Sequence, residues 1–140
     1  MSFVEYALKF IGKPYVWGGD GSGKFGGGFD CSGLVVECLQ AFGAVEGDFT
    51  AQALYKHLLA LGWAKVPCNL VNASDVLFWG KSEAAVTHVS LAASDCQHVE
   101  AGGGGSKCKT AEISTGMVRL RPIAARKDFV AALRAPKGRF

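Results

Sequence analysis

One cysteine stands where the sequence predicts the start of a helix. Cys31 lies in the stretch Phe29–Val35, between a glycine-rich loop and a run of apolar residues. A helix N-terminus favours negative charge, so a thiol at this place is expected to form a thiolate. The backbone N–H groups around it are placed to receive an oxyanion. The charge of Asp30 opposes the thiolate, and a protonated histidine nearby would offset that effect. The residue types therefore predict a nucleophile.

Two later segments supply partners for such a nucleophile. His88 begins a strand-like run and shares one face of it with Ser90. His98 and Glu100 share one face of the next strand-like run. Either of these two side chains can meet the His88 ring and select its tautomer. Cys31, His88 and one of the pair then form a nucleophile, a base and a residue that orients the base.

The periodicity of apolar residues indicates which elements position these side chains. Three helices are expected early in the chain: one capped by Ser2 and carrying Phe3 to Phe10, one from Cys31 to Phe42, and one capped by Thr50. Strands are expected at 76–79, 87–93, 97–101 and 117–121, and a last short helix at 127–134. Helices followed by an antiparallel sheet predict an α+β domain, and the length predicts one domain over residues 1–140.

Other motifs favour ordinary structure over function. The glycine-rich loop fits two phosphate-binding patterns, Gly18 to Lys24 and Gly21 to Gly26, but neither is followed by the helix that such a loop requires. Cys38 falls on the buried face of the second helix. Cys96 and Cys108 can form a disulfide in an oxidising compartment, and with His98 they can in principle hold a metal ion, although the spacing is irregular. We expect no metal and no cofactor.

Composition and charge narrow the possible partners. Residues 1–118 carry 8 basic and 11 acidic side chains, whereas residues 119–140 carry 7 basic and 1 acidic. No aromatic side chains alternate with these basic residues as in a nucleic-acid platform, so a solvated surface is expected and no nucleic-acid partner. The apolar runs are too short to span a membrane, and no secretory signal precedes the first helix. These patterns predict a monomer that is synthesised in a cytoplasm with reduced thiols.

In this order and combination, five segments resemble the NlpC/p60 cell-wall endopeptidases of the papain-like superfamily. They are Gly12-Lys13-Pro14-Tyr15-Val16-Trp17-Gly18-Gly19, Phe29-Asp30-Cys31-Ser32-Gly33-Leu34-Val35, Thr50-Ala51-Gln52, Ser74-Asp75-Val76-Leu77-Phe78-Trp79 and Thr87-His88-Val89-Ser90-Leu91. The sequence differs from the family in its longer glycine-rich insertion, and in Ala73-Ser74 where a Pro-Gly pair usually precedes the aspartate. The resemblance implies N-terminal helices packed on a central antiparallel sheet.

The resemblance also implies roles for individual residues. Cys31 matches the nucleophile and His88 the general base. The family's third polar residue follows after one hairpin, which matches Glu100, with His98 in reserve. Substrate-binding roles are implied for a further four residues: Tyr15, Asp30, Ser32 and Thr50.

The implied activity is hydrolysis of peptidoglycan stem peptides through an acyl-enzyme, most typically between γ-D-glutamate and a diamino acid. Two alternatives stay open. The first is another acyl-transfer reaction of the same thiol, such as cleavage of the sugar–peptide amide. The second is a non-catalytic module that binds the wall or has a structural role. A lytic domain of this kind without a signal is expected in a phage lysin, a tail component or an antibacterial effector. It would be made in the bacterial cytoplasm and reach the wall or periplasm through a holin, a tail or a secretion system.

Overall fold

The computed structural model of the protein describes residues 1–21, 28–105, 107–109, 111 and 114–138. Three α-helices precede the strands: α1 (Phe3–Leu8), α2 (Cys31–Ala41) and α3 (Ala51–Ala60). Six strands follow: β1 (Ala64–Val66), β2 (Val76–Gly80), β3 (Val86–Ala92), β4 (Gln97–Gly102), β5 (Met117–Pro122) and β6 (Phe129–Arg134). Short 3-10 helices occupy Cys68–Leu70, Ile123–Ala125 and Pro136–Gly138. None of the described helices is long and apolar enough to cross a membrane.

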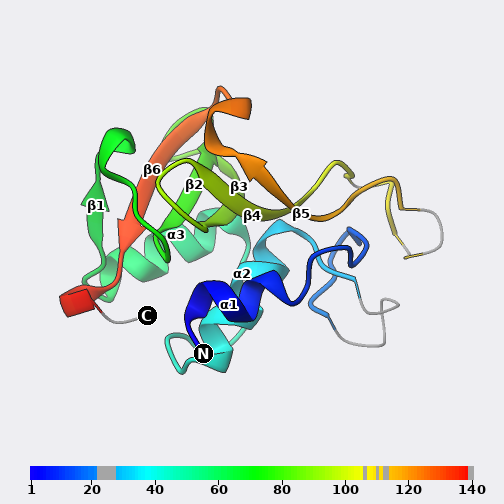
Figure 1. Ribbon diagram of the computed structural model, residues 1–140, viewed down its shortest axis with the longest axis horizontal. Coiled ribbons are helices and arrows are strands. Elements are labelled where there is room, and N and C mark those ends of the chain that lie inside the picture. Colours follow the sequence, from blue (N-terminus) through cyan, green and yellow to red (C-terminus); the bar gives the residue numbers. More distant parts are fainter. Residues whose placement is uncertain (22–27, 106, 110, 112–113, 139–140) are drawn as a thin grey trace.

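The six strands form one antiparallel sheet in the order β1-β6-β2-β3-β4-β5, and the helices cover one of its faces (Figure 1). The main core lies between them, where Phe78, Val89 and Val99 of the sheet pack with Leu34 and Leu54 of the helices. A smaller apolar cluster lies on the opposite face of the sheet. The predicted α+β class, with helices packed on an antiparallel sheet, is confirmed.

The helix starts follow from capping side chains. Ser2 and Glu5 form a reciprocal capping box at α1. Asp30 caps α2, and Thr50 caps α3 by accepting a hydrogen bond from the Ala53 N–H. These three starts are confirmed, and so are the four predicted strands within a residue or two at each end.

The predicted helix at 127–134 is wrong, because this segment contains β6. The strand lies between β1 and β2 and hydrogen-bonds to both. Its side chains alternate: Ala131 and Leu133 enter the main core, and Ala132 enters the smaller cluster on the other face. Eight residues are too few for apolar spacing to separate a buried strand from a helix, and the two partner strands decide the outcome. The short strand β1 was not predicted either.

Strands β3 and β4 pair over a short stretch and then separate. Their paired residues are Leu91 with Val99 and Ala92 with His98. The Ala92 N–H donates to Asp75 next to β2, and successive N–H groups of a strand point to opposite sides. The Val89 N–H therefore points toward β4. The two strands no longer pair at this level, so this N–H has no hydrogen-bond partner on β4. This opening in the sheet lies between His88 and Glu100.

Ser74 has an unusual backbone conformation just before β2. Its φ angle is +77°, in the left-handed region that is costly for residues with a Cβ atom. The sequence has serine here, at the position where the resemblance described above implies glycine. Its N–H donates to the Ala92 carbonyl, so the turn is held against the end of β3.

We predict that Ser74→Gly raises the free energy of unfolding. Glycine adopts this φ without a Cβ clash, and the gain is expected to be about 0.5–1 kcal/mol after allowance for the greater freedom of the unfolded chain. Urea unfolding measures the change. Ala73→Gly is the matched control, because Ala73 is exposed and its φ is not positive. That variant should be destabilised, and an equal response of both variants would contradict the explanation.

Candidate active site

The N-terminus of α2 is fixed by a cap and by close backbone packing. Asp30 Oδ1 accepts a hydrogen bond of 2.6 Å from the Gly33 N–H. A Cβ atom at Gly33 would lie 2.0 Å from the Gly19 carbonyl oxygen, so only glycine fits there. Cys31 is thus held as the first residue of the helix, as the sequence predicts.

The Cys31 thiol reaches the opening between β3 and β4. The backbone N–H of Val89, which has no partner on β4, hydrogen-bonds to the thiol, as does the N–H of Ser32. His88 directly precedes Val89, so the sulfur lies against the strand segment that carries the candidate base. The structure therefore brings the candidate nucleophile and the candidate base together at the opening between β3 and β4.

The expected thiolate is not the resting form of Cys31. Burial raises the pKa of the thiol to about 11, and the charge of Asp30 adds to this effect. The Val89 and Ser32 N–H groups and the charge of Arg126 oppose the increase without cancelling it. A neutral Cys31 thiol at neutral pH follows from this pKa.

His88 and Glu100 form a buried pair across the opening. The distance from His88 Nε2 to Glu100 Oε1 is 2.8 Å, and the side chains are 10% and 3% exposed. Burial alone would raise the pKa of Glu100, but the hydrogen bond and charge of His88, with smaller effects of His98 and Arg119, hold it at about 2. A carboxylate only accepts hydrogen bonds, so Nε2 carries the hydrogen, and Nδ1 of a neutral ring is left to accept a proton.

His98, the reserve candidate, lies in a separate network. Its Nδ1 is 2.6 Å from Ser90 Oγ, which also accepts a 2.9 Å hydrogen bond from Trp79 Nε1. The His98 ring packs against the Trp79 ring with centroids 5.2 Å apart. Burial lowers the pKa of His98 to about 4. Glu100 is therefore the residue that contacts His88, and His98 supports the strand beside it.

Three of the four predicted substrate-binding residues line one hollow of about 270 Å³ beside the α2 N-terminus. Asp30 and Ser32 form one wall and Thr50 contributes to another. Tyr15 lies outside this hollow and is buried; burial and the charges of Cys31 and Asp30 raise the pKa of its hydroxyl. The first three residues can therefore contact one ligand.

Of the other cysteines, Cys108 lies near Tyr15. All five thiols are free, so Cys96 and Cys108 form no disulfide, and Cys38 is buried in the core as predicted. Among the described residues, no three His, Cys, Asp or Glu side chains are arranged to hold a metal ion. Both phosphate-loop patterns extend into residues 22–27, which lie outside the described part of the chain.

Two arginines near the site were not singled out from the sequence. Arg119 Nε donates to Glu100 Oε2 over 3.0 Å, and the Arg126 guanidinium lies 5.5 Å from the Trp79 ring centroid. Both belong to the basic segment that we expected to be a solvated surface. Only the pairing of β4 with β5 places Arg119 opposite Glu100, and no local pattern reveals that register.

Comparison with known proteins identifies the family. The profile of the NlpC/P60 family matches residues 12–127. The chain belongs to the NlpC/P60 family. Protein P54 of Enterococcus faecium is 33% identical over 113 residues, which cover 80% of this chain and 20% of P54. Peptidoglycan endopeptidase RipA of Mycolicibacterium smegmatis is 30% identical over 125 residues, covering 80% of this chain and 24% of RipA. The chain thus spans only about a fifth to a quarter of the length of these relatives.

Solved NlpC/P60 structures have the same fold. The NlpC/p60 domain of the peptidoglycan hydrolase SagA superposes with a TM-score of 0.69 at 25% identity, covering 95% of this chain and 96% of that domain. The peptidoglycan hydrolase RipB of Mycobacterium tuberculosis gives 0.65 at 28% identity, with coverage of 95% and 64%. RipD of the same organism, a non-catalytic NlpC/p60 protein, gives 0.64 at 20% identity over 97% of this chain and 98% of RipD. The fold is therefore common to catalytic and non-catalytic members of the family.

We predict that His98 makes the protein less stable in mild acid. The unfolded chain takes up a proton near pH 6.5, whereas the buried ring does so near pH 4. Stability should therefore decrease as the pH falls through this window, by roughly 2–3 kcal/mol at most. His98→Gln should flatten the decrease, which urea unfolding at several pH values between 4 and 7 measures. An unchanged slope would show that other groups cause it.

Proposed function

We propose that the protein is a cysteine endopeptidase that cleaves peptidoglycan stem peptides. The observation that carries the proposal is the buried His88–Glu100 pair beside a cysteine at the N-terminus of α2. A structural cysteine needs no such partners, whereas an acyl-transfer nucleophile needs a base and a residue that orients it.

The geometry suggests how the proton moves. Cys31 Sγ attacks the carbonyl carbon of the amide as His88 Nδ1 takes the thiol proton, which gives a tetrahedral intermediate. The backbone N–H groups at the α2 N-terminus stabilise its oxyanion. His88 then returns the proton to the leaving amine, and a thioester to Cys31 remains. Water, deprotonated by His88, hydrolyses this thioester and restores the thiol.

The ionised Glu100 carboxylate has a definite role in these reaction steps. Its carboxylate accepts the hydrogen bond from His88 Nε2, which leaves Nδ1 free to take the thiol proton. The imidazolium that forms is stabilised by the negative charge 2.8 Å away. Because the Cys31 thiol is neutral at rest, this stabilisation matters at the moment of attack.

The relatives support this class of substrate. RipA is named a peptidoglycan endopeptidase, and the SagA domain belongs to a peptidoglycan hydrolase. We propose the bond between γ-D-glutamate and a diamino acid as the site of cleavage, with Asp30 and Ser32 contacting the substrate on its amino side and Thr50 lining the same hollow. We further propose a role as a phage lysin, a tail component or an antibacterial effector, which acts at the wall after delivery from the cytoplasm.

Two other reactions give different products. An amidase would separate the sugar from the peptide, whereas an endopeptidase cuts within the peptide, and mass spectrometry of the fragments distinguishes them. A non-catalytic wall-binding protein, as RipD is described, would release nothing. The retained Cys31, His88 and Glu100 favour the catalytic alternative.

We predict that Cys31→Ala abolishes the release of soluble fragments from purified peptidoglycan. Loss of the nucleophile should decrease the rate by several orders of magnitude. Digestion of diaminopimelate-type and lysine-type walls, followed by mass spectrometry, measures this and identifies the bond. Cys68→Ala is the control, since Cys68 is an exposed thiol outside the site. Undiminished release by Cys31→Ala would refute the proposed mechanism.

We predict opposite outcomes for the two candidates for the third residue. Glu100→Gln removes the charge beside His88 and should lower kcat about 10–100-fold, whereas His98→Gln should leave kcat within about threefold of the unsubstituted protein. Steady-state hydrolysis of a purified muropeptide gives both values. Greater loss in His98→Gln would assign the role to His98.

A further inference from the structure

The two oxygens of Glu100 have different partners. Oε1 receives the hydrogen bond from His88, and Oε2 receives one of 3.0 Å from Arg119 Nε. The carboxylate is 3% exposed, and the Arg119 side chain is 31% exposed. Arg119 thus contacts the buried carboxylate from its outer side, away from the thiol.

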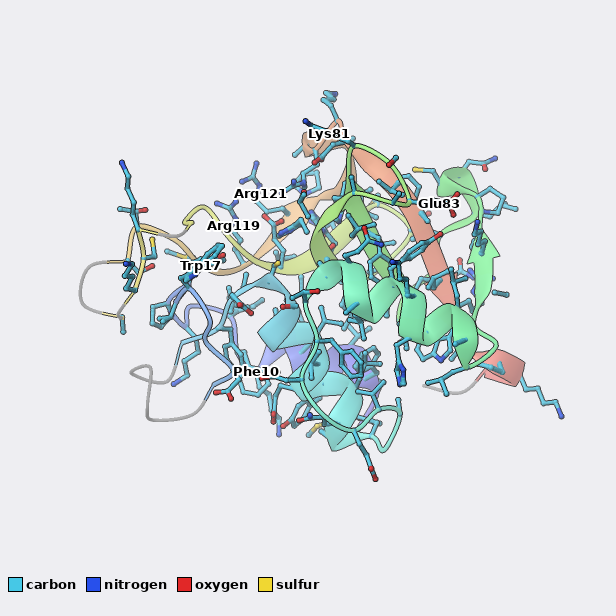
Figure 2. The ribbon with its side chains drawn as sticks, turned by 180° about the vertical axis from the view of Figure 1, so that it is seen from behind. Phe10, Trp17, Lys81, Glu83, Arg119 and Arg121 are labelled. Atoms are coloured by element: carbon cyan, nitrogen blue, oxygen red, sulfur yellow. The ribbon has the colours of Figure 1, made fainter. Side chains whose placement is uncertain are left out.

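The sheet explains why this second contact matters. Strand β4 has parted from β3 at the level of Glu100, so no backbone ladder fixes Glu100 relative to His88. On its other side, β4 pairs with β5 along its full length, and Glu100 lies directly opposite Arg119. The arginine therefore reaches Glu100 from the strand that does hold β4 in register. Figure 2 shows Arg119 and Arg121 following one another along β5.

The surroundings of the guanidinium are shaped to hold it. A Cβ atom at Gly102 would lie 3.2 Å from Nη2, and one at Gly103 would lie 2.9 Å from Nη1. Gly103 also has a φ of +79°, which glycine adopts without strain. A larger side chain at either position would crowd the arginine. The end of β4 thus leaves room for Arg119 beside the carboxylate.

We propose that Arg119 is a positioning residue of the active site, which holds the Glu100 carboxylate so that Oε1 is presented to His88. The proposal rests on the proposed function and adds a fourth side chain to it. Arg119 acts through Glu100 and does not contact the reacting atoms. A glutamate has three side-chain torsions, and a second directed contact removes the freedom that one hydrogen bond leaves.

The effect on ionisation follows from the groups around Glu100. These are His88 of β3, His98 of β4 and Arg119 of β5. Removing the arginine leaves a buried carboxylate with less compensating charge, so the pKa of Glu100 should rise from about 2. The carboxyl group itself should then titrate at higher pH in a variant that lacks the arginine.

The kinetic experiment compares Arg119→Met, Arg119→Lys and Arg121→Met. Arg121 lies two residues along β5, on the same face but opposite His98, and is the matched control. In Arg119→Met we expect kcat to fall about 10–100-fold and KM to change less than about threefold. Lysine should restore part of kcat, and Arg121→Met should behave like the unsubstituted protein. An unchanged kcat in Arg119→Met would overturn the proposal, as would an equal loss of kcat in Arg121→Met.

A second measurement separates this proposal from the proposed function. Carbon-13 NMR of the Glu100 carboxyl gives its titration in the unsubstituted protein and in Arg119→Met, whether or not either is active. We expect the titration to move to higher pH in the variant and partly back in Arg119→Lys. No movement would overturn the positioning role. If titration moves but the unsubstituted protein releases no peptidoglycan fragments, only the proposed function fails. Should Arg119→Met not fold, Arg119→Lys and Arg119→Gln provide the same comparison.

Discussion

The separation of β3 from β4 is the constraint on which the site depends. An antiparallel ladder that continued past Leu91 would consume the Val89 N–H in a hydrogen bond to β4. Because the strands part, that N–H is available to the Cys31 thiol, and the α2 N-terminus packs where the ladder stops. His88 and Glu100 then face each other across the opening through side chains. A buried N–H without a partner is costly, so the thiol also helps to satisfy the opened sheet.

The charges of the site are balanced within a few ångströms. Cys31 is kept neutral by burial, and Glu100 is kept ionised by His88 and Arg119 despite burial. The negative charge therefore lies on the side of His88 away from the sulfur while the thiol is neutral. Such an arrangement stabilises an imidazolium as it forms, and it does not require a preformed thiolate. Placing a fixed charge where positive charge develops is the way in which an enzyme interior lowers a barrier.

Local patterns predicted elements well where capping side chains or glycines mark their ends. Ser2, Asp30 and Thr50 act at the positions expected of them, and Gly43 ends α2 with a φ of +73°. The prediction failed at 127–134, where apolar residues at short range fit either a helix or a strand. The partners β1 and β2 lie 48 or more residues earlier in the chain, and only their pairing makes β6 a strand. Strand β1 was not predicted for the same reason, because only its pairing with the distant β6 makes it a strand.

The sequence by itself marked Cys31 as the candidate nucleophile, because a cysteine after a capping aspartate and before two small residues is a local arrangement. The neutral state of its thiol follows from burial in the folded chain. The sequence also supplied His88, and two candidates for its partner on one face of the next strand. Only the tertiary structure decides which of those two side chains contacts His88. Glu100 contacts His88 because the strands part at that level, and His98 contacts Ser90 because they still pair beside it. The tertiary structure also decides the contact of Arg119 with Glu100. This contact depends on the register of β4 with β5, and no residue near Arg119 in the sequence specifies that register.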